Sequence, residues 1–264
     1  MEGEQYGEVD EFQMRHEDPS DFLECLTWHQ AIAKSEGYEN EEIIIHYSSQ
    51  FERDKPWLQA GGTLVAEAFV LSERQANLFL GFGYAISSLN KQVIKVLDIG
   101  GGNGYMAYWL RDFFPNQTFE WTILESQGVA ESYNVWQENA NVKWICKEDF
   151  ARDSDVVLIS CALQYIEHWE QLLIDATSNC NILFLKRLPV LDSIKHEYGV
   201  QRIFRKSRGD EFDASVPCHF FGATEIHDLV LKSMALVYGQ TCDYESVIFK
   251  NNEVKFQNLL FKKL

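Results

Sequence analysis

The chain has 264 residues, of which 46% are hydrophobic and 14% aromatic, and its formal net charge is −17. This length and composition can bury the core of one large domain, or of one domain with an added cap. The charge argues against DNA or RNA as a partner, because polyanions would be repelled and the densest basic stretches are short.

Residues 1–21 are polar and acid-rich, with no sustained hydrophobic period, so no packed element is predicted there. The segment lacks the charged and apolar regions of a signal peptide, and no apolar run approaches the ~20 residues that cross a bilayer. The six cysteines show no C-x-x-C pair and no metal-ligand spacing. We therefore expect a cytoplasmic protein with free thiols, no bound metal and no membrane span.

Helical periodicity dominates residues 22–90. We expect helices over 22–36, 40–51 and 64–89, the last with a break near the glycines at 81 and 83. The sequence thus predicts a helical N-terminal cap spanning 22–90.

From residue 91 onward, short apolar runs alternate with longer amphipathic ones, which is typical of a parallel sheet with crossover helices. The predicted strands are 93–99, 119–124, 142–146, 156–160 and 182–186. The predicted helices are 105–114, 130–138, 167–177 and 224–232, the last with Thr224 placed to cap its free amides. The expected fold is α/β, a Rossmann-like, doubly wound, mostly parallel sheet in a domain spanning 91–264.

A glycine-rich turn, Asp98-Ile99-Gly100-Gly101-Gly102-Asn103-Gly104, follows the first of these strands. Glycines at 100, 102 and 104 let the backbone turn sharply and approach a ligand closely. Dinucleotides bind at similar turns, but the Asp98 carboxylate would repel a pyrophosphate and attract the cationic S-adenosylmethionine. The motif favours S-adenosylmethionine over NAD, which remains the alternative. Glu125, at the end of the second strand, is placed to accept hydrogen bonds from both ribose hydroxyls.

These features resemble the class I S-adenosylmethionine-dependent methyltransferases over about residues 93–264. Two apolar-rich runs, 235–241 and 254–261, resemble the antiparallel hairpin that ends that fold. A narrower similarity is to a poorly characterised bacterial group often associated with polysaccharide biosynthesis. The narrower match lies in Gly37-Tyr38, Asp98-Ile99-Gly100-Gly101, Ser160, Leu163-Gln164-Tyr165-Ile166, Arg187, Gln201 and residues 217–221.

The resemblance implies a role for each part of the cofactor site. The glycine turn would hold the methionine moiety, Glu125 the ribose, and Ser126, Gln127, Asp149 and Phe150 the adenine. The cofactor-binding residues it implies are Asp98, Gly100, Gly101, Gly102, Asn103, Gly104, Glu125, Ser126, Asp149, Phe150 and Ser160.

In such enzymes the acceptor meets the cofactor at the carboxyl end of the fourth strand, here residues 160–165. Many small-molecule O-methyltransferases carry His where this chain has Gln164, and glutamine can position an acceptor but cannot remove its proton. The catalytic candidates are Gln164, Tyr165, His168, one helical turn beyond Gln164, and Arg187, which could bind an acceptor carboxylate or phosphate. His196, Tyr198 and His219 follow the fifth strand and are further candidates.

We therefore expect a methyltransferase acting on oxygen or nitrogen of a small-molecule or saccharide acceptor, with a homodimer left open. The alternatives are a non-catalytic binding protein that kept the methyltransferase fold and an NAD-dependent oxidoreductase.

Overall fold

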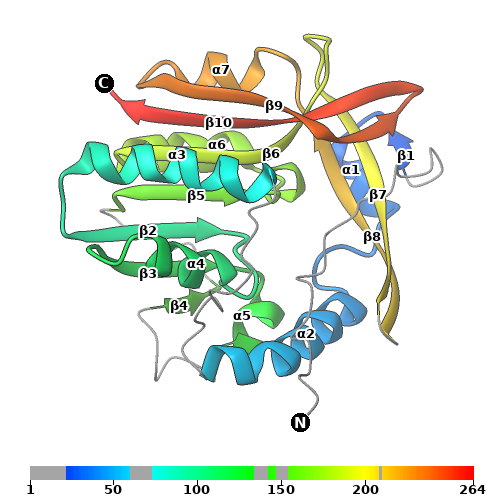
Figure 1. Ribbon diagram of the computed structural model, residues 1–264. Helices are drawn as coiled ribbons and strands as arrows, with labels where there is room; N and C mark the ends of the chain where they lie inside the picture. Colours follow the sequence, from blue (N-terminus) through cyan, green and yellow to red (C-terminus); the bar gives the residue numbers. More distant parts are fainter. Residues whose placement is uncertain (1–21, 60–72, 134–141, 147–153, 208–209) are drawn as a thin grey trace.

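The computed structural model describes residues 22–59, 73–133, 142–146, 154–207 and 210–264, which form two β-sheets with helices packed around them (Figure 1). The predictions for residues 1–21 and for Asp149 and Phe150 lie outside the described residues. Within those ranges, no helix has the length and apolar content needed to span a membrane.

The larger sheet has seven strands in the order β4-β3-β2-β5-β6-β10-β9. Strands β2 to β6 pair in parallel, whereas β10 runs antiparallel to both β6 and β9. The expected Rossmann-like sheet with a C-terminal antiparallel hairpin is therefore confirmed. The strands are β2 (Val93–Ile99), β3 (Thr118–Leu124), β4 (Val142–Ile145), β5 (Val156–Ser160), β6 (Ile182–Val190), β9 (Met234–Phe249) and β10 (Asn252–Lys263).

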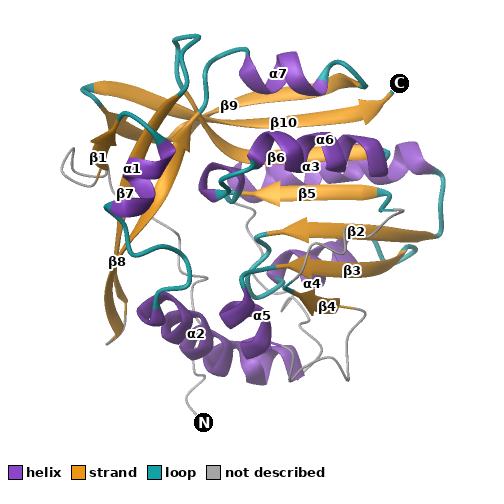
Figure 2. Cartoon of the chain, turned by 180° about the vertical axis from the view of Figure 1, so that it is seen from behind, coloured by secondary structure: helices purple, strands orange, loops and turns teal. Residues whose placement is uncertain are grey.

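Helices cover both faces of this sheet (Figures 1 and 2). Alternate residues of each strand face opposite sides, so Val96 packs with one set of helices and Leu97 with the other. Helices α3 (Glu73–Leu89), α4 (Tyr105–Phe113) and α5 (Gln127–Tyr133) lie on the first side, and α6 (Trp169–Asn179) and α7 (Glu225–Val230) on the second.

Helix α3 departs from the expectation of a cap helix. Its Phe82, Ala85 and Ile86 are buried in the core of the larger sheet. The helix is also unbroken at Gly81, where a Cβ would lie 3.0 Å from the ring of Phe184. The glycine therefore permits close packing on β6 and does not end the helix.

A second, three-stranded antiparallel sheet has the order β1-β7-β8, from β1 (Phe22–Cys25), β7 (Glu197–Ser207) and β8 (Asp210–Phe220). The prediction of a helix over 22–36 is wrong at its start, because Phe22 pairs with β7 and packs against aromatic rings. Helix α1 (Trp28–Ala33) begins only after Thr27, whose hydroxyl accepts a hydrogen bond from the Gln30 N–H at 3.2 Å. Strands β7 and β8 were not predicted.

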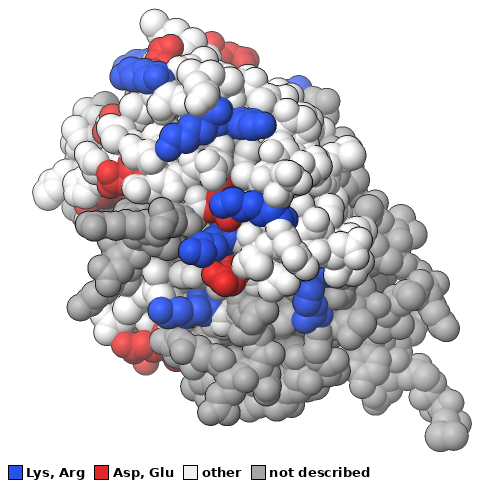
Figure 3. All heavy atoms as spheres, turned by 90° about the vertical axis from the view of Figure 1, so that its left-hand side faces the viewer, with Lys and Arg blue, Asp and Glu red and all other residues white. Residues whose placement is uncertain are grey.

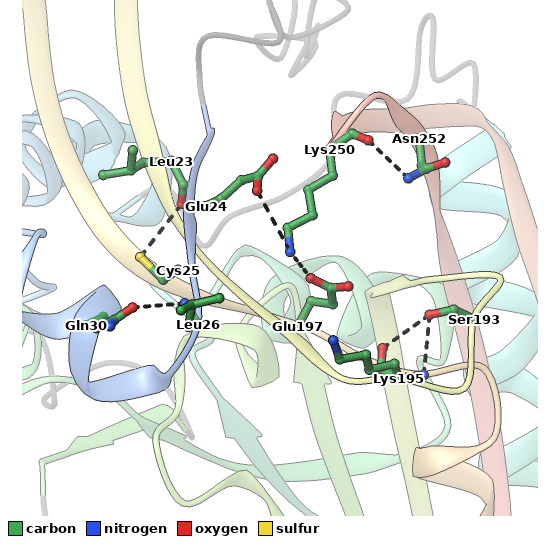
Figure 4. A network of polar contacts seen from close by, with 10 residues as sticks. All are labelled: Leu23, Glu24, Cys25, Leu26, Gln30, Ser193, Lys195, Glu197, Lys250 and Asn252. Carbon is green, nitrogen blue, oxygen red and sulfur yellow. Dashed lines mark hydrogen bonds and ion pairs between the residues drawn. The ribbon is translucent and has the colours of Figure 1, made fainter.

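The tip of the β9–β10 hairpin joins the two sheets (Figure 4). Lys250 and Asn251 have φ of +51° and +60°, which gives the two-residue turn a twist that suits a hairpin. The Lys250 ammonium forms an ion pair with Glu197 and lies 3.9 Å from a Glu24 carboxylate oxygen. The ring of Phe249 stacks on Phe220 with centroids 3.9 Å apart. The second sheet is thus held at the carboxyl end of the larger one.

Helix α2 (Glu41–Gln59) connects the two parts on the glycine-turn side. Its Ile43 packs with Ala214 and Val216 of β8, and its Ser48 hydroxyl hydrogen bonds to that of Ser132 on α5 at 2.9 Å.

Two local features concern polar groups at the ends of elements. The prediction that Thr224 caps α7 is wrong: its side chain makes no capping bond and its hydroxyl donates to Asp228 at 3.0 Å. At the amino ends of the parallel strands, Lys and Arg lie among Asp and Glu (Figure 3). Here Lys91 pairs with Asp155 at 2.5 Å, so part of the acidic charge is compensated away from the glycine turn.

Candidate functional site

The glycine turn joins β2 to α4 and is closely packed. Gly100, Gly102 and Gly104 have φ of +71°, +56° and +75°, a region that side chains disfavour. A Cβ on Gly100 would lie 2.3 Å from the Cβ of Ala162, and one on Gly101 would lie 2.5 Å from a carboxylate oxygen of Asp98. Residue size is therefore restricted at Gly100 and Gly101.

Hydrogen bonds from the neighbouring strands fix the turn in place. The Gly100 N–H donates to the Leu124 carbonyl at 2.9 Å, and the Trp144 indole N–H donates to the Gly102 carbonyl at 2.8 Å. The Gly102 N–H donates to Glu125 Oε1 at 2.8 Å. Asn103 is buried, and its side-chain oxygen accepts from the Tyr105 N–H at 3.3 Å. A rigid turn thus leads into the positive N-terminal end of α4.

Asp98 is fully buried beneath this turn. Its Oδ2 accepts a hydrogen bond from the Trp121 indole at 3.2 Å, but its Oδ1 is buried with no hydrogen-bond partner. The pKa of Asp98 is raised to about 7, chiefly by burial and also by the nearby Glu125, against the opposing effects of Trp121 and Lys186. Leaving a carboxylate oxygen buried and unpaired is costly, so a cationic partner at this position would be strongly stabilised.

Glu125 lies at the end of β3, beside the turn. Its two carboxylate oxygens accept from the Gly102 and Ser126 N–H groups, the latter at 3.2 Å. Burial raises the pKa of Glu125, the two backbone bonds lower it, and the nearby Glu39 carboxylate raises it. The Ser126 hydroxyl is buried without a hydrogen-bond partner, and the Gln127 N–H donates to Glu39 at 3.1 Å. This corner can accept hydrogen bonds from ligand hydroxyls.

The carboxyl end of β5 carries the predicted acceptor residues. Ser160 ends the strand, Cys161 has φ of +55°, and the 3-10 turn Leu163–Tyr165 follows. Gln164 is 2% exposed, and its amide nitrogen donates to the Cys161 sulfur at 3.3 Å. Its Oε1 is buried and has no hydrogen-bond partner. The Tyr165 hydroxyl donates to Gln201 of β7 at 2.7 Å, so this turn contacts the second sheet.

A strap between α1 and α2, residues 36–39, passes from the second sheet to α5. The Glu36 and Gly37 N–H groups donate to the Ser215 carbonyl at 3.0 Å, while Glu39 accepts from α5 as described above. Tyr38 at the centre of the strap lies with its ring 5.1 Å from that of Tyr165. Burial raises the pKa of both phenols well above 10.

The strap brings Tyr38 to the predicted residues, although nothing in the local sequence indicated a contact with Tyr165. Negative charge on Glu125, Cys161 or Tyr47 raises the pKa of the Tyr38 phenol, so all three side chains lie close to it. Tyr38 is therefore located between the glycine-turn corner and the end of β5. Tyr47, on α2, also lies near the turn, since its ring is 3.5 Å from where a Gly102 Cβ would be. Tyr38 therefore contacts Tyr165 at the end of β5 and lies near Tyr47 and Glu125 at the glycine-turn corner.

Of the four catalytic candidates, His168 lies apart from this corner and Arg187 is buried on β6. His168 is exposed at the start of α6, because the 3-10 turn ends at Tyr165. The expectation that His168 shares a helical face with Gln164 is therefore wrong. Arg187 is 2% exposed, and its guanidinium lies 5.6 Å from the centre of the Phe256 ring. Its backbone N–H donates a hydrogen bond to Asn258 Oδ1 at 3.0 Å. It packs between β6 and β10.

His196 and His219 form a chain of contacts that reaches the Ile166 backbone. His196 Nδ1 lies 2.7 Å from Glu225 Oε2, and its Nε2 lies 2.8 Å from His219 Nδ1. Burial, and then the neighbouring His196, lower the pKa of His219 to about 3, and its ring stacks on Trp28 at 3.8 Å. Negative charge on Cys218 raises the pKa of the Tyr38 and Tyr165 phenols, so Cys218 lies near them. Because side chains alternate along a strand, His219 lies on the opposite face of β8 from Cys218. In the described ranges, no three His, Cys, Asp or Glu side chains are placed to hold a metal ion.

Comparison with known proteins finds no matching family model and no matching curated protein. Among solved structures, the chain is similar to an S-adenosylmethionine-dependent methyltransferase from Clostridium acetobutylicum, with 11% identity, a TM-score of 0.49, and coverage of 82% of this chain and 98% of that chain.

Two further matches have comparable scores. The N-terminal domain of EvdMO1, crystallised with S-adenosylhomocysteine bound, is 15% identical, with a TM-score of 0.48 over 81% of this chain and 97% of that chain. A pericyclic reaction enzyme is 11% identical, with a TM-score of 0.47 over 81% of this chain and 54% of that chain. These likenesses are too low to assign an activity.

Proposed function

We propose that this chain is an S-adenosylmethionine-dependent methyltransferase acting on a small-molecule acceptor. The observation that carries the proposal is the buried, unpaired oxygen of Asp98 beneath the glycine turn. A carboxylate there is unstable alone and is stabilised by a cation. The methyl donor carries a cationic amino group and a sulfonium, whereas a dinucleotide would bring a pyrophosphate.

The residues around the turn fit the rest of the donor. The backbone of Gly100 to Gly104 and the start of α4 would hold its carboxylate, since a helix N-terminus favours an anion. Glu125 would accept from the ribose hydroxyls, with Ser126 close by. Bound there, the donor supplies an electrophilic methyl group for an in-line displacement. Catalysis then consists chiefly of holding the acceptor atom in line with that group.

On the acceptor side, we assign Gln164, Tyr165 and Tyr38 to binding. They lie at the carboxyl end of β5, where ligands bind in open α/β sheets. Tyrosine rings and neutral hydrogen-bonding groups suit a saccharide or another uncharged small molecule. We assign no catalytic role to His168, because it is exposed at the start of α6, and none to Arg187, because its guanidinium lies over the Phe256 ring.

Two alternatives make different predictions. An NAD-dependent oxidoreductase would have to place a pyrophosphate beside Asp98. A non-catalytic binding protein would take up the donor but release no product.

Calorimetric titration with S-adenosylhomocysteine and with NADH tests the proposal. We expect binding of S-adenosylhomocysteine alone, at least tenfold weaker in Asp98→Asn because a buried charge pair is lost. Binding of NADH alone would refute the proposal. Release of S-adenosylhomocysteine from the donor in the presence of an acceptor then distinguishes an enzyme from a binding protein.

A further inference from the structure

The amide oxygen of Gln164 is a hydrogen-bond acceptor that the fold leaves unused. The side chain is 2% exposed, and its Nε2 is already bound to the Cys161 sulfur. Its Oε1 has no hydrogen-bond partner. A buried carbonyl left unpaired costs about 1–3 kcal/mol, so the oxygen is poised for a donor that the bound acceptor would bring.

The groups around Gln164 are aromatic and uncharged at neutral pH. The Tyr165 hydroxyl is bound to Gln201, and the Tyr38 ring lies against that of Tyr165. Both phenols keep their protons, because burial raises their pKa values well above 10. They can donate and accept hydrogen bonds but cannot remove a proton from an acceptor.

The carboxylates of Asp98 and Glu125 serve the donor side in the function proposed above. Asp98 faces the glycine turn, and Glu125 is held by the Gly102 and Ser126 N–H groups. A carboxylate paired with a cation is a weak base. His168 is exposed at the start of α6, and the pKa of His219, lowered to about 3, makes that imidazole a weak base although it lies beside the Ile166 backbone.

We propose that the acceptor's reacting atom is an amine nitrogen, and that Gln164 Oε1 accepts a hydrogen bond from its N–H and orients the nitrogen for attack. The inference rests on the proposed methyl transfer and names the acceptor class. A neutral amine already carries the lone pair that the reaction needs. The nitrogen lone pair forms the new N–C bond as the C–S bond breaks. The electron pair of the C–S bond stays on sulfur, and an N–H proton then passes to water. A hydroxyl would have to transfer its proton to a base.

The aromatic surroundings favour the same acceptor. N-methylation converts a neutral amine into an ammonium ion, which the faces of tyrosine rings stabilise by about 0.5–2 kcal/mol. O-methylation forms no such charge on the acceptor. The net charge of −17 also attracts protonated amines from solution, which raises their rate of encounter.

The test uses matched acceptors that differ only in the reacting group. The full chain is incubated with methyl-labelled S-adenosylmethionine and with pairs such as phenethylamine and 2-phenylethanol, glucosamine and glucose, and aniline and phenol. We expect label in amine products and none in the hydroxyl partners. The rate should rise with pH and then reach a plateau. The midpoint of the rise should follow the pKa of the amine, so it should differ between phenethylamine and aniline and should not follow the pKa of a group on the protein.

The variant Gln164→Met keeps the length of the side chain and removes the hydrogen-bonding oxygen. We expect about a tenfold loss of kcat/KM for the amine, equivalent to one hydrogen bond of about 1.4 kcal/mol, with unchanged affinity for S-adenosylhomocysteine. Gln171→Met, on the exposed face of α6, is the matched control and should leave both values unchanged.

Each outcome bears on one proposal or the other. If the wild-type chain does not bind S-adenosylhomocysteine, the proposed function itself is overturned. With that binding intact, three results would overturn the amine proposal alone. They are methylation of any hydroxyl partner, no methylation of any of the three amines, and full amine turnover by Gln164→Met.

Discussion

Replacing Asp98 by asparagine should stabilise the free protein while weakening its binding of the donor. In the folded chain the pKa of Asp98 is about 7, against 3.8 for the ordinary carboxyl, because the group is fully buried. At about 1.4 kcal/mol per pKa unit, the ionised carboxylate destabilises the folded state by roughly 4 kcal/mol above pH 7. An unpaired amide in Asp98→Asn costs about 1–3 kcal/mol of this, so a net gain of about 1–3 kcal/mol is expected at pH 8.

The sign of the pH dependence follows from the raised pKa. Between pH 3.8 and about 7 the folded state holds the Asp98 proton more tightly than the unfolded state. This group therefore lowers the free energy of unfolding as pH rises through that window. Asparagine does not ionise, so the gap between variant and wild type should shrink from pH 8 to pH 5.

Urea denaturation of the ligand-free chain at the two pH values measures the gap. Asp192→Asn is the control, because Asp192 is exposed and its replacement should change the free energy of unfolding by less than about 0.5 kcal/mol. Calorimetry with S-adenosylhomocysteine at pH 8 measures the opposite effect on binding. A variant that is less stable at pH 8 than wild type, or that binds the ligand equally well, would refute the account of a strained carboxylate awaiting a cation.

Three further changes test the turn and the contact between the sheets. Glu125→Gln should weaken S-adenosylhomocysteine binding about tenfold in calorimetry, since it removes a carboxylate assigned to the ribose; equal affinity would contradict that role. Gly100→Ala should lower both the melting temperature and ligand affinity far more than Gly102→Ala, because only at Gly100 does a Cβ clash at 2.3 Å; similar losses would contradict this. Phe249→Ala should cost about 3–5 kcal/mol in urea denaturation by removing the stack on Phe220, and a loss below 1 kcal/mol would show that the stack contributes little.

The larger sheet could be predicted because its signals are local. Strands β2 and β5 have the predicted bounds, since each is a buried apolar run, and the glycines of the turn adopt the left-handed φ that D-x-G-x-G-x-G implies. Strand β6 continues past the predicted residue 186 to Val190, because it is buried on both faces and pairs with β10 along that length.

The second sheet could not be predicted because its stability comes from distant partners. Strand β1 has only four residues and is extended because it pairs with β7. Strand β7 carries several charges, including Arg202 and Arg205, which hide its alternating pattern.

The candidate site was partly predictable. Asp98, Glu125 and Gln164 lie at strand ends, and strand ends in a parallel sheet meet at one edge. His168 was misplaced because the i, i+4 rule assumes an α-helix, whereas the backbone is extended at Ile166. The position of Tyr38 depends on hydrogen bonds from the strap to Ser215 and Gln127, which no local pattern encodes.

The Lys250 turn has a consequence for how the chain is made. Residues 249–250 make the contacts that hold the three-stranded sheet to the larger one. A nascent chain can therefore assemble the parallel strands on the ribosome before the three-stranded sheet has its contacts with the β9–β10 hairpin. Docking of that sheet must await the synthesis of Phe249 and Lys250.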